Sequence, residues 1–389
     1  MSRNFLKKIA ALGFSLFLKN YSKADALSSR SFHWKEFDLR FLKELGLSQK
    51  FEKNLVYSPA SIKEAFYTTA HFSESSIQKE FKEFFQMEDS QTLSSKGSFL
   101  FASKNTLWVK DSKSLSSFAK DEVAQRRVNI KTLNPAQPQL AADKVNRAVE
   151  EETHGLIKDV INKEAISKDL FFAIVVNTLY LKAKWLYHFN PAIPRDFHLE
   201  NGQTKKVPMM FLKKNLPYFA SKTFEAVKLS YRDSQVEMLF ILPREKKTIE
   251  QLMPELLQDL SKSVEAWDSS TEMLLSLPKF KVESSFDKIA EYLESQGLGA
   301  KSQSNSLRYF SKLYNPSEKS HLAKVIHKAV MIVDEEGTEA AAVTASMPEG
   351  ASFKKAPKQI KLNFDKAFLF VLRDPQSQKI LFTGYIKDP

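Results

Sequence analysis

The feature that most constrains the fold is an apolar run, "FFAIVVNTLYLKAKW", at residues 171–185. The run is rich in β-branched and aromatic residues, which favour strands. It is too apolar for an exposed element, so we expect a buried strand. One polar residue, Asn177, interrupts it. A buried amide without partners costs about 1–3 kcal/mol, so Asn177 requires hydrogen-bond partners. His327 interrupts a second apolar run, "KVIHKAVMIV", in the same way, and the two residues suggest two strands joined by a polar bridge.

The remaining pattern places helices early in the chain and strands in its centre and C-terminal part. We predict helices from Trp34 to Leu45 and over 58–72, 76–85, 143–157 and 286–297, and strands over 98–109, 171–185, 205–211, 224–230, 235–243 and 271–283, with two more in 366–386 joined by a turn at Asp374-Pro375. Ser58 and Pro59 suit a helix start, whereas Gly46, Gly155 and Gly297 suit helix ends. This order is typical of the α+β class. No internal repeat or low-complexity linker divides the chain, so we expect a single domain over residues 27–389.

The N-terminus has the three parts of a secretory signal peptide. A basic start, "MSRNFLKK", precedes a ten-residue apolar run and the small residues Ala24 and Ala26. We therefore expect residues 1–26 to be removed, which lowers the net charge from +12 to +8 by removing five basic residues and one acidic residue. The mature protein is expected to be secreted, or periplasmic in a bacterium, with no membrane association.

The sequence carries no signature of a catalyst. It contains no cysteine, which excludes disulfides, thiolate catalysis and cysteine-based metal sites. The nucleophile elbow, the phosphate-binding loop, the dinucleotide fingerprint and the zinc-protease motif are all absent. The seven histidines form no close metal-type pair, and the basic residues are scattered. We predict no enzymatic activity, no metal, no cofactor and no nucleic-acid partner.

One long segment, "KVIHKAVMIVDEEGTEAAAVTA" at residues 324–345, closely resembles the hinge of the serpins, the serine protease inhibitor superfamily. Four further segments are similar to serpin elements in family order: "NLVYSPASI" (54–62), "NTLYLKAKW" (177–185), "KKVPMM" (205–210) and the C-terminal pair (363–389). The resemblance spans residues 30–389. It implies the serpin fold, with early helices packed on a large mixed sheet A, two further sheets and an exposed reactive loop at about residues 335–360.

The resemblance also implies a mechanism. A target serine protease would attack the loop and form a covalent acyl-enzyme, and the cut loop would then insert into sheet A as a new strand. Insertion would distort the protease before deacylation. Such an inhibitor acts once, as a monomer, and needs no cofactor. Only about ten residues, "EDSQTLSSKG", stand where relatives carry the helix that binds heparin, so polyanion activation there is not expected.

The resemblance assigns hinge and shutter residues by position. The hinge residues are Glu335, Gly337, Thr338, Glu339, Ala340, Ala341 and Ala342; the shutter residues, which would control the opening of sheet A between its third and fifth strands, are Ser58, Ser61, Asn177 and His327. Because side chains alternate along a strand, an inserted loop would bury Thr338, Ala340, Ala342 and Thr344. These are small and uncharged, whereas the charge at Glu339 would face outward. Gly337 would supply a swivel.

The usual spacing from Glu335 places the reactive bond at Ala351-Ser352, which suits elastase-like proteases. The segment from Ala351 to Phe364 is longer than expected, so cleavage at Phe353, Lys354 or Lys355 stays open. The alternative function is that of a non-inhibitory serpin, a carrier, chaperone or storage protein; inhibition of cysteine proteases is a further alternative. Non-inhibitory members tend to carry bulky or charged hinge residues, and this hinge does not.

Overall fold

The computed structural model describes eleven main stretches of the chain. These are residues 41–47, 52–85, 100–113, 115–125, 128–166, 173–244, 247–252, 267–298, 322–338, 359–374 and 379–389, with residues 38, 254–255 and 311–315 in addition. The predicted signal peptide lies outside the described residues. Residues 339–358, which include most of the predicted reactive loop, lie outside them as well.

The strands form three sheets, which we name A, B and C. Sheet A has the order β11 (Phe280–Phe286), β12 (Leu322–Val333), β13 (Gly337–Thr338), β4 (Ala173–Lys184), β2 (Leu100–Val109) and β3 (Asn129–Thr132). Sheet B has the order β1 (Leu55–Tyr57), β16 (Lys379–Ile386), β15 (Phe368–Asp374), β9 (Glu237–Pro243), β8 (Phe224–Ser230) and β7 (Tyr218–Ala220). Sheet C has the order β14 (Gln359–Asn363), β10 (Glu272–Pro278), β6 (Thr204–Asn215) and β5 (Asn190–His198).

Sheet A is mixed, and the apolar run of residues 171–185 forms its long interior strand β4. This strand pairs antiparallel with β2 and parallel with β12. Its side chains alternate between two apolar clusters: Ile174 and Val176 belong to one, and Ala173 and Val175 to the other. Both faces of β4 are therefore buried, which is why the run carries so little polar character.

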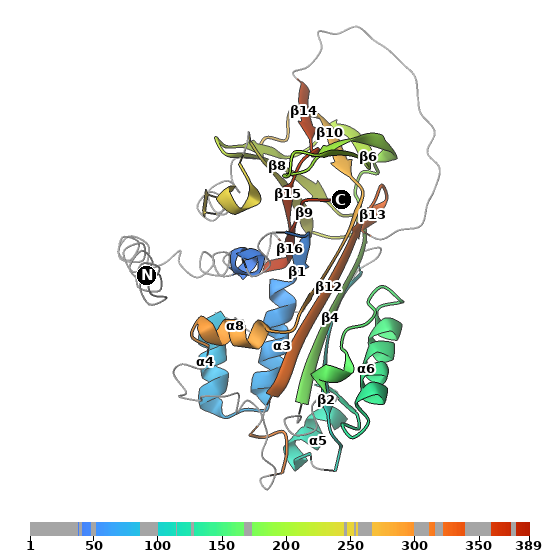
Figure 1. Cartoon of the computed structure of the whole chain (residues 1–389). Helices are drawn as coiled ribbons and strands as arrows, with labels where there is room; N and C mark the ends of the chain where they lie inside the picture. The colour runs from blue at the N-terminus through green and yellow to red at the C-terminus, as the bar shows by residue number, and fades with distance from the viewer. Residues whose placement is uncertain are drawn as a thin grey trace, which may run out of the picture.

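Helices cover the two faces of sheet A. Helix α6 (Pro138–Glu152) packs on one face, and the helices α3 (Pro59–His71), α4 (Ser75–Phe85) and α8 (Ile289–Ser295) lie on the other (Figure 1). Two further helical elements are α5 (Ser117–Ala124) and the 3₁₀ turn η1 (Lys163–Ala165). The arrangement confirms the expected α+β class.

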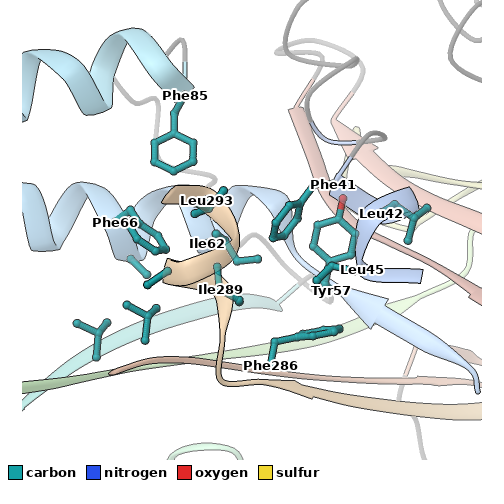
Figure 2. Close-up of a cluster of buried hydrophobic side chains, with 14 of the residues drawn as sticks. Phe41, Leu42, Leu45, Tyr57, Ile62, Phe66, Phe85, Phe286, Ile289 and Leu293 are labelled. Carbon is teal, nitrogen blue, oxygen red and sulfur yellow. The ribbon is translucent and has the colours of Figure 1, made fainter. Parts of the chain in front are cut away.

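The cluster on the α3 side of sheet A joins segments far apart in the sequence. Phe41 and Leu45 of the helical segment 41–47 contact it together with Phe66 of α3, and Phe286 and Leu293 come from residues more than two hundred positions later (Figure 2). The ring of Phe41 lies 5.3 Å from that of Tyr57, edge to face. The cluster ties the first described helix to α3 and α8.

Several helix ends agree with the sequence prediction, and others do not. Ser58 caps α3, because its side chain accepts a hydrogen bond from Ser61 N. Gly155 and Gly297 have positive φ angles just beyond α6 and α8, as expected of helix ends. Gly46 lies within the helical segment 41–47 rather than after it, and α6 begins at Pro138, before the predicted residue 143.

The largest departure from the sequence prediction concerns residues 271–283, expected as one strand. They form two strands, β10 and β11, which belong to different sheets. The break follows Pro278, which has no N–H to donate to a ladder. The strands β1, β3, β5, β7 and β14 and the helix α5 were not predicted; most are short or lie at sheet edges, where the apolar pattern is weak.

Within the part of the chain that the structure describes, no helix is long and apolar enough to cross a bilayer.

Candidate functional site

The four predicted shutter residues meet under the middle of sheet A. Asn177 of β4 and His327 of β12 occupy paired positions in the parallel ladder between these strands. Ser58 and Ser61 lie at the start of α3, which packs on that face of the sheet. All four side chains are buried. The structure thus brings together residues that the sequence separates by as many as 269 positions.

Hydrogen bonds connect the four residues into one cluster. The Nδ1 of His327 lies 2.5 Å from the Oδ1 of Asn177, and the backbone N–H of Ser58 donates to the Nε2 of His327 at 3.1 Å. The Asn177 amide nitrogen lies 2.6 Å from Ser61 Oγ and donates to Asn105 Oδ1 at 2.6 Å. The buried amide of Asn177 therefore has the partners that its position requires.

These contacts determine the tautomer and charge of His327. Since Nε2 accepts from a backbone N–H, the single proton of a neutral ring resides on Nδ1 and is donated to Asn177. Burial lowers the pKa of His327 to about 3, because the charged form would lose its hydration. The ring also stacks on Phe286 at 6.3 Å. His327 is therefore a neutral bridge between β12 and α3.

Above this cluster the two strands separate, and the first hinge residues lie between them. The β12–β4 ladder ends at the pair Ala329 and Leu179. Beyond it Thr338 of β13 pairs antiparallel with Val333 on one side and with Ala183 on the other. Figure 1 shows β13 at the upper ends of β12 and β4. Sheet A is therefore open at this end and already holds two residues of the hinge.

The fit of β13 depends on small residues. A Cβ atom on Gly337 would lie 1.9 Å from the backbone oxygen of Ala183, far inside contact distance. Gly337 does not have a positive φ, so in this conformation glycine is required for close approach. The predicted role as a swivel stays a prediction.

The side chain of Thr338 is fully buried. Its Oγ1 lies 2.8 Å from the hydroxyl of Tyr231. Tyr231 stacks on Trp185 with ring centroids 4.5 Å apart, and Trp185 Nε1 donates to the backbone oxygen of Asp334 at 3.0 Å. Two stacked aromatic residues thus contact the chain at Thr338 and at Asp334.

Glu335 is held in place by charge and by the backbone. Its carboxylate accepts from Lys279 at 2.7 Å and from the N–H of Ala192 at 3.0 Å. Partial burial opposes ionisation, but the hydrogen bonds from Lys279 and from backbone N–H groups outweigh it, so the pKa of Glu335 lies below its usual value. The carboxylate is therefore anionic at neutral pH and ties the hinge to the break between β10 and β11.

The remaining predicted site residues lie outside the described part of the chain. These are the hinge residues Glu339, Ala340, Ala341 and Ala342, the bond Ala351-Ser352 and its alternatives Phe353, Lys354 and Lys355. Among the residues that are described, no group of three or more His, Asp or Glu is arranged to hold a metal ion.

Sequence reasoning missed several residues that complete the site. Asn105 lies within the polar run Ser103–Thr106 of β2, so no interruption of an apolar run marks it. Tyr231 and Lys279 carry no such signal, because their partners are known only once the strands are packed. Trp185 was part of a segment used for the resemblance, but its contact with Asp334 was not anticipated.

Comparisons with known proteins agree with this geometry. The family model described as Serpin (serine protease inhibitor) matches residues 33–389. A protein described as an uncharacterized serpin-like protein, from Methanosarcina mazei, is 26% identical over 361 residues, which cover 87% of this chain and 82% of the relative. Antithrombin-III of Mus musculus is 27% identical over 387 residues, covering 91% of this chain and 80% of the relative.

Solved structures share the fold. Serpin48 of the insect Tenebrio molitor superposes with a TM-score of 0.77 at 19% identity, covering 94% of this chain and 100% of that chain. Thyroxine-binding globulin in complex with thyroxine gives a TM-score of 0.76 at 20% identity, with 93% and 99% covered. The family match extends over nearly all of the chain, from the first described helix to the last strand. The chain belongs to the serpin (serine protease inhibitor) family.

Proposed function

We propose that this chain inhibits serine proteases by a single-use mechanism and catalyses no reaction itself. A protease would cleave the reactive loop and be held as a covalent acyl-enzyme. The loop would then enter sheet A between β12 and β4. Serpins generally inhibit proteases rather than act as catalysts, and relatives such as the leukocyte elastase inhibitor of Xenopus laevis, 31% identical over 259 residues, carry inhibition in their names.

The observation that carries the proposal is the position of β13. The hinge residues Gly337 and Thr338 occupy the space between β12 and β4, and their small side chains fit there. The inward residues that follow in the sequence, Ala340, Ala342 and Thr344, are also small and uncharged. Continued insertion would therefore bury no charge and little volume, which is what strand addition requires.

We further propose elastase-like proteases as targets, with Ala351-Ser352 as the reactive bond. A small residue before the bond suits a small primary pocket. The proposal of secretion rests on the N-terminal segment 1–26, and the proposal of a monomer on the one-to-one chemistry of an acyl-enzyme. The size of the mature chain after export tests the proposal of secretion. Its molecular mass in solution tests the proposal of a monomer.

The direct experiment is incubation of the purified chain with pancreatic elastase, chymotrypsin, trypsin and a papain-type cysteine protease. We expect an SDS-resistant complex with elastase. We also expect release of a C-terminal peptide whose measured mass corresponds to residues 352–389. A peptide beginning after Phe353, Lys354 or Lys355 would move the reactive bond and the preferred protease. The cysteine protease tests cross-class inhibition.

Cleavage without a complex would contradict the proposal. The chain would then resemble a carrier such as the thyroxine-binding relative, and thermal stability before and after cleavage would separate the cases. A cut loop that still inserts should raise the melting temperature even where no protease is trapped, whereas a loop that cannot insert should leave it unchanged.

A further inference from the structure

The segment 185–189, which links β4 to β5, contacts the hinge through its backbone and one side chain. The N–H of Trp185 donates to the backbone oxygen of Glu336 at 2.9 Å, and the N–H of Phe189 donates to that of Glu335 at 3.0 Å. Between these two residues, His188 extends its imidazole to the side chain of Glu336, with Nδ1 lying 3.2 Å from Oε2. Glu336 is therefore held at its main chain and at its carboxylate by one short segment.

A third residue, Arg232, determines which ring nitrogen carries the proton when His188 is neutral. Arg232, in the turn after β8, places Nη2 3.4 Å from the Nε2 of His188. A guanidinium can only donate, so Nε2 must accept from it. The ring proton of a neutral His188 then resides on Nδ1 and is donated to Glu336. Arg232, His188 and Glu336 form a chain of contacts that ends on the hinge.

We propose that His188 is a positioning residue for the hinge and that its protonation tightens the hold on Glu336. This inference rests on the proposed inhibitory function and deepens it. A hinge held in sheet A restrains the loop that a protease must first engage, so the rate of association with the protease would depend on pH.

The two partners differ in their exposure to solvent. The His188 side chain is 41% exposed, so protons reach it, whereas that of Glu336 is 16% exposed and is partly shielded from water. Histidine changes charge between about pH 5 and 8. A second proton on Nε2 would convert the contact with Glu336 into an ion pair and end acceptance from Arg232. Arg232 is exposed and can turn to solvent.

Other charged groups surround the three residues. Those on the neighbouring elements are Lys184 at the end of β4, Asp233 beside Arg232, Asp334 and Glu335 beside Glu336, and Lys279 after β10. Three of them already have partners at the hinge: Glu335 pairs with Lys279, and Asp334 Oδ1 accepts from the N–H groups of Glu336 and Gly337. The added charge of His188 would lie 3.2 Å from the carboxylate of Glu336.

The first test measures hinge retention without any protease. Amide exchange at Gly337 and Thr338 is followed at pH 5.5 and 7.5 and corrected for the intrinsic effect of pH. Wild type should be about two- to fivefold more protected at pH 5.5, the range expected for one partly exposed charge pair. His188→Gln, which keeps a donor to Glu336 but does not titrate, should lose this difference. His188→Lys, with a permanent charge, should be protected at both pH values.

The matched control is His198→Gln. His198 lies at the opposite end of β5, where its Nδ1 contacts Thr204 Oγ1. This variant should behave as wild type. An equal pH difference in wild type and in His188→Gln would overturn the inference, and so would an absence of any difference in wild type.

The second test uses one serine protease that forms a complex. The ratio of association rates, His188→Gln over wild type, should be about two to five at pH 5.5 and near one at pH 7.5; the protease's own pH dependence cancels in the ratio. A ratio of association rates that is the same at both pH values would contradict the link between retention of the hinge in sheet A and the rate of inhibition. If no protease forms a complex, the proposed function fails, and the exchange experiment still decides the role of His188.

Discussion

His327 Nδ1 and Asn177 Oδ1 lie 2.5 Å apart at paired positions of β12 and β4. This contact joins the two strands between which the hinge begins to insert. It lies seven positions along β4 from Lys184, the residue that pairs with Gly337. The same imidazole accepts from the N-cap residue of α3. Parting of the strands at this level would therefore break contacts to both the sheet and the helix.

The free energy of unfolding should decrease as the pH falls, in part because His327 is neutral in the folded state. Its pKa is depressed to about 3 in the folded state, against about 6.5 in an unfolded chain. The unfolded state thus binds the proton first, and stability is lost as pH falls from about 6.5 towards 3, by as much as a few kcal/mol. Urea unfolding of wild type and His327→Gln at pH 7.5, 6, 5 and 4 checks this.

We expect His327→Gln to be the less stable protein at pH 7.5 and the gap to narrow as pH falls, since the variant has no imidazole to titrate. Carboxylates contribute equally to both proteins and cancel in the difference. A gap that stays constant across the series would contradict this account.

Thr338→Arg should convert the inhibitor into a substrate. Thr338 is fully buried between Val333 and Ala183, and a buried unpaired charge costs several kcal/mol. Slower insertion lets the protease deacylate, so the stoichiometry of inhibition should rise about tenfold or more. The measurement is a titration of residual protease activity.

The matched control for this variant is Ala341→Arg, because the predicted register places residue 341 on the outward face. Its stoichiometry should stay close to that of wild type. Equal effects of the two substitutions would refute the alternation on which the insertion argument depends.

Tyr231 and Thr338 should be energetically coupled. The contact between their hydroxyl groups is buried, and such a hydrogen bond contributes about 0.5–1.5 kcal/mol. A double-mutant cycle with Tyr231→Phe and Thr338→Val, measured by urea unfolding, should return a coupling of this size. Strictly additive effects would mean that the contact does not hold the hinge.

Gly337→Ala should displace the hinge from sheet A. The added methyl group would meet the backbone oxygen of Ala183 at 1.9 Å, and backbone cannot yield as a side chain end does. We expect a cost of about 1–3 kcal/mol and faster amide exchange at residues 337 and 338. Gly202→Ala is the control: nothing lies within 4 Å of its Cβ, so hinge exchange should not change despite local strain from its positive φ.

The sequence by itself determined the class of fold and the family, and the expectation of a serpin fold is confirmed. The fold class followed from local signals: the apolar run that became β4, the Ser58-Pro59 start of α3, and the polar interruptions at Asn177 and His327. The family followed from the resemblance of residues 324–345 and four further segments to serpin elements. Each signal reports the environment of one residue. A polar group within a buried strand implies a partner, even before the partner is known.

Only the tertiary structure decided which groups meet. Lys279 reaches Glu335 because residues 271–283 divide at Pro278 between two sheets, and a period-two pattern cannot show such a division. Tyr231 and His188 reach the hinge because the end of β8 and the β4–β5 link lie against β13. These contacts join residues more than fifty positions apart, and their geometry depends on how whole sheets pack. Local propensity and periodicity carry no information about contacts between residues so far apart in the sequence. The contacts that hold the hinge were therefore decided by packing.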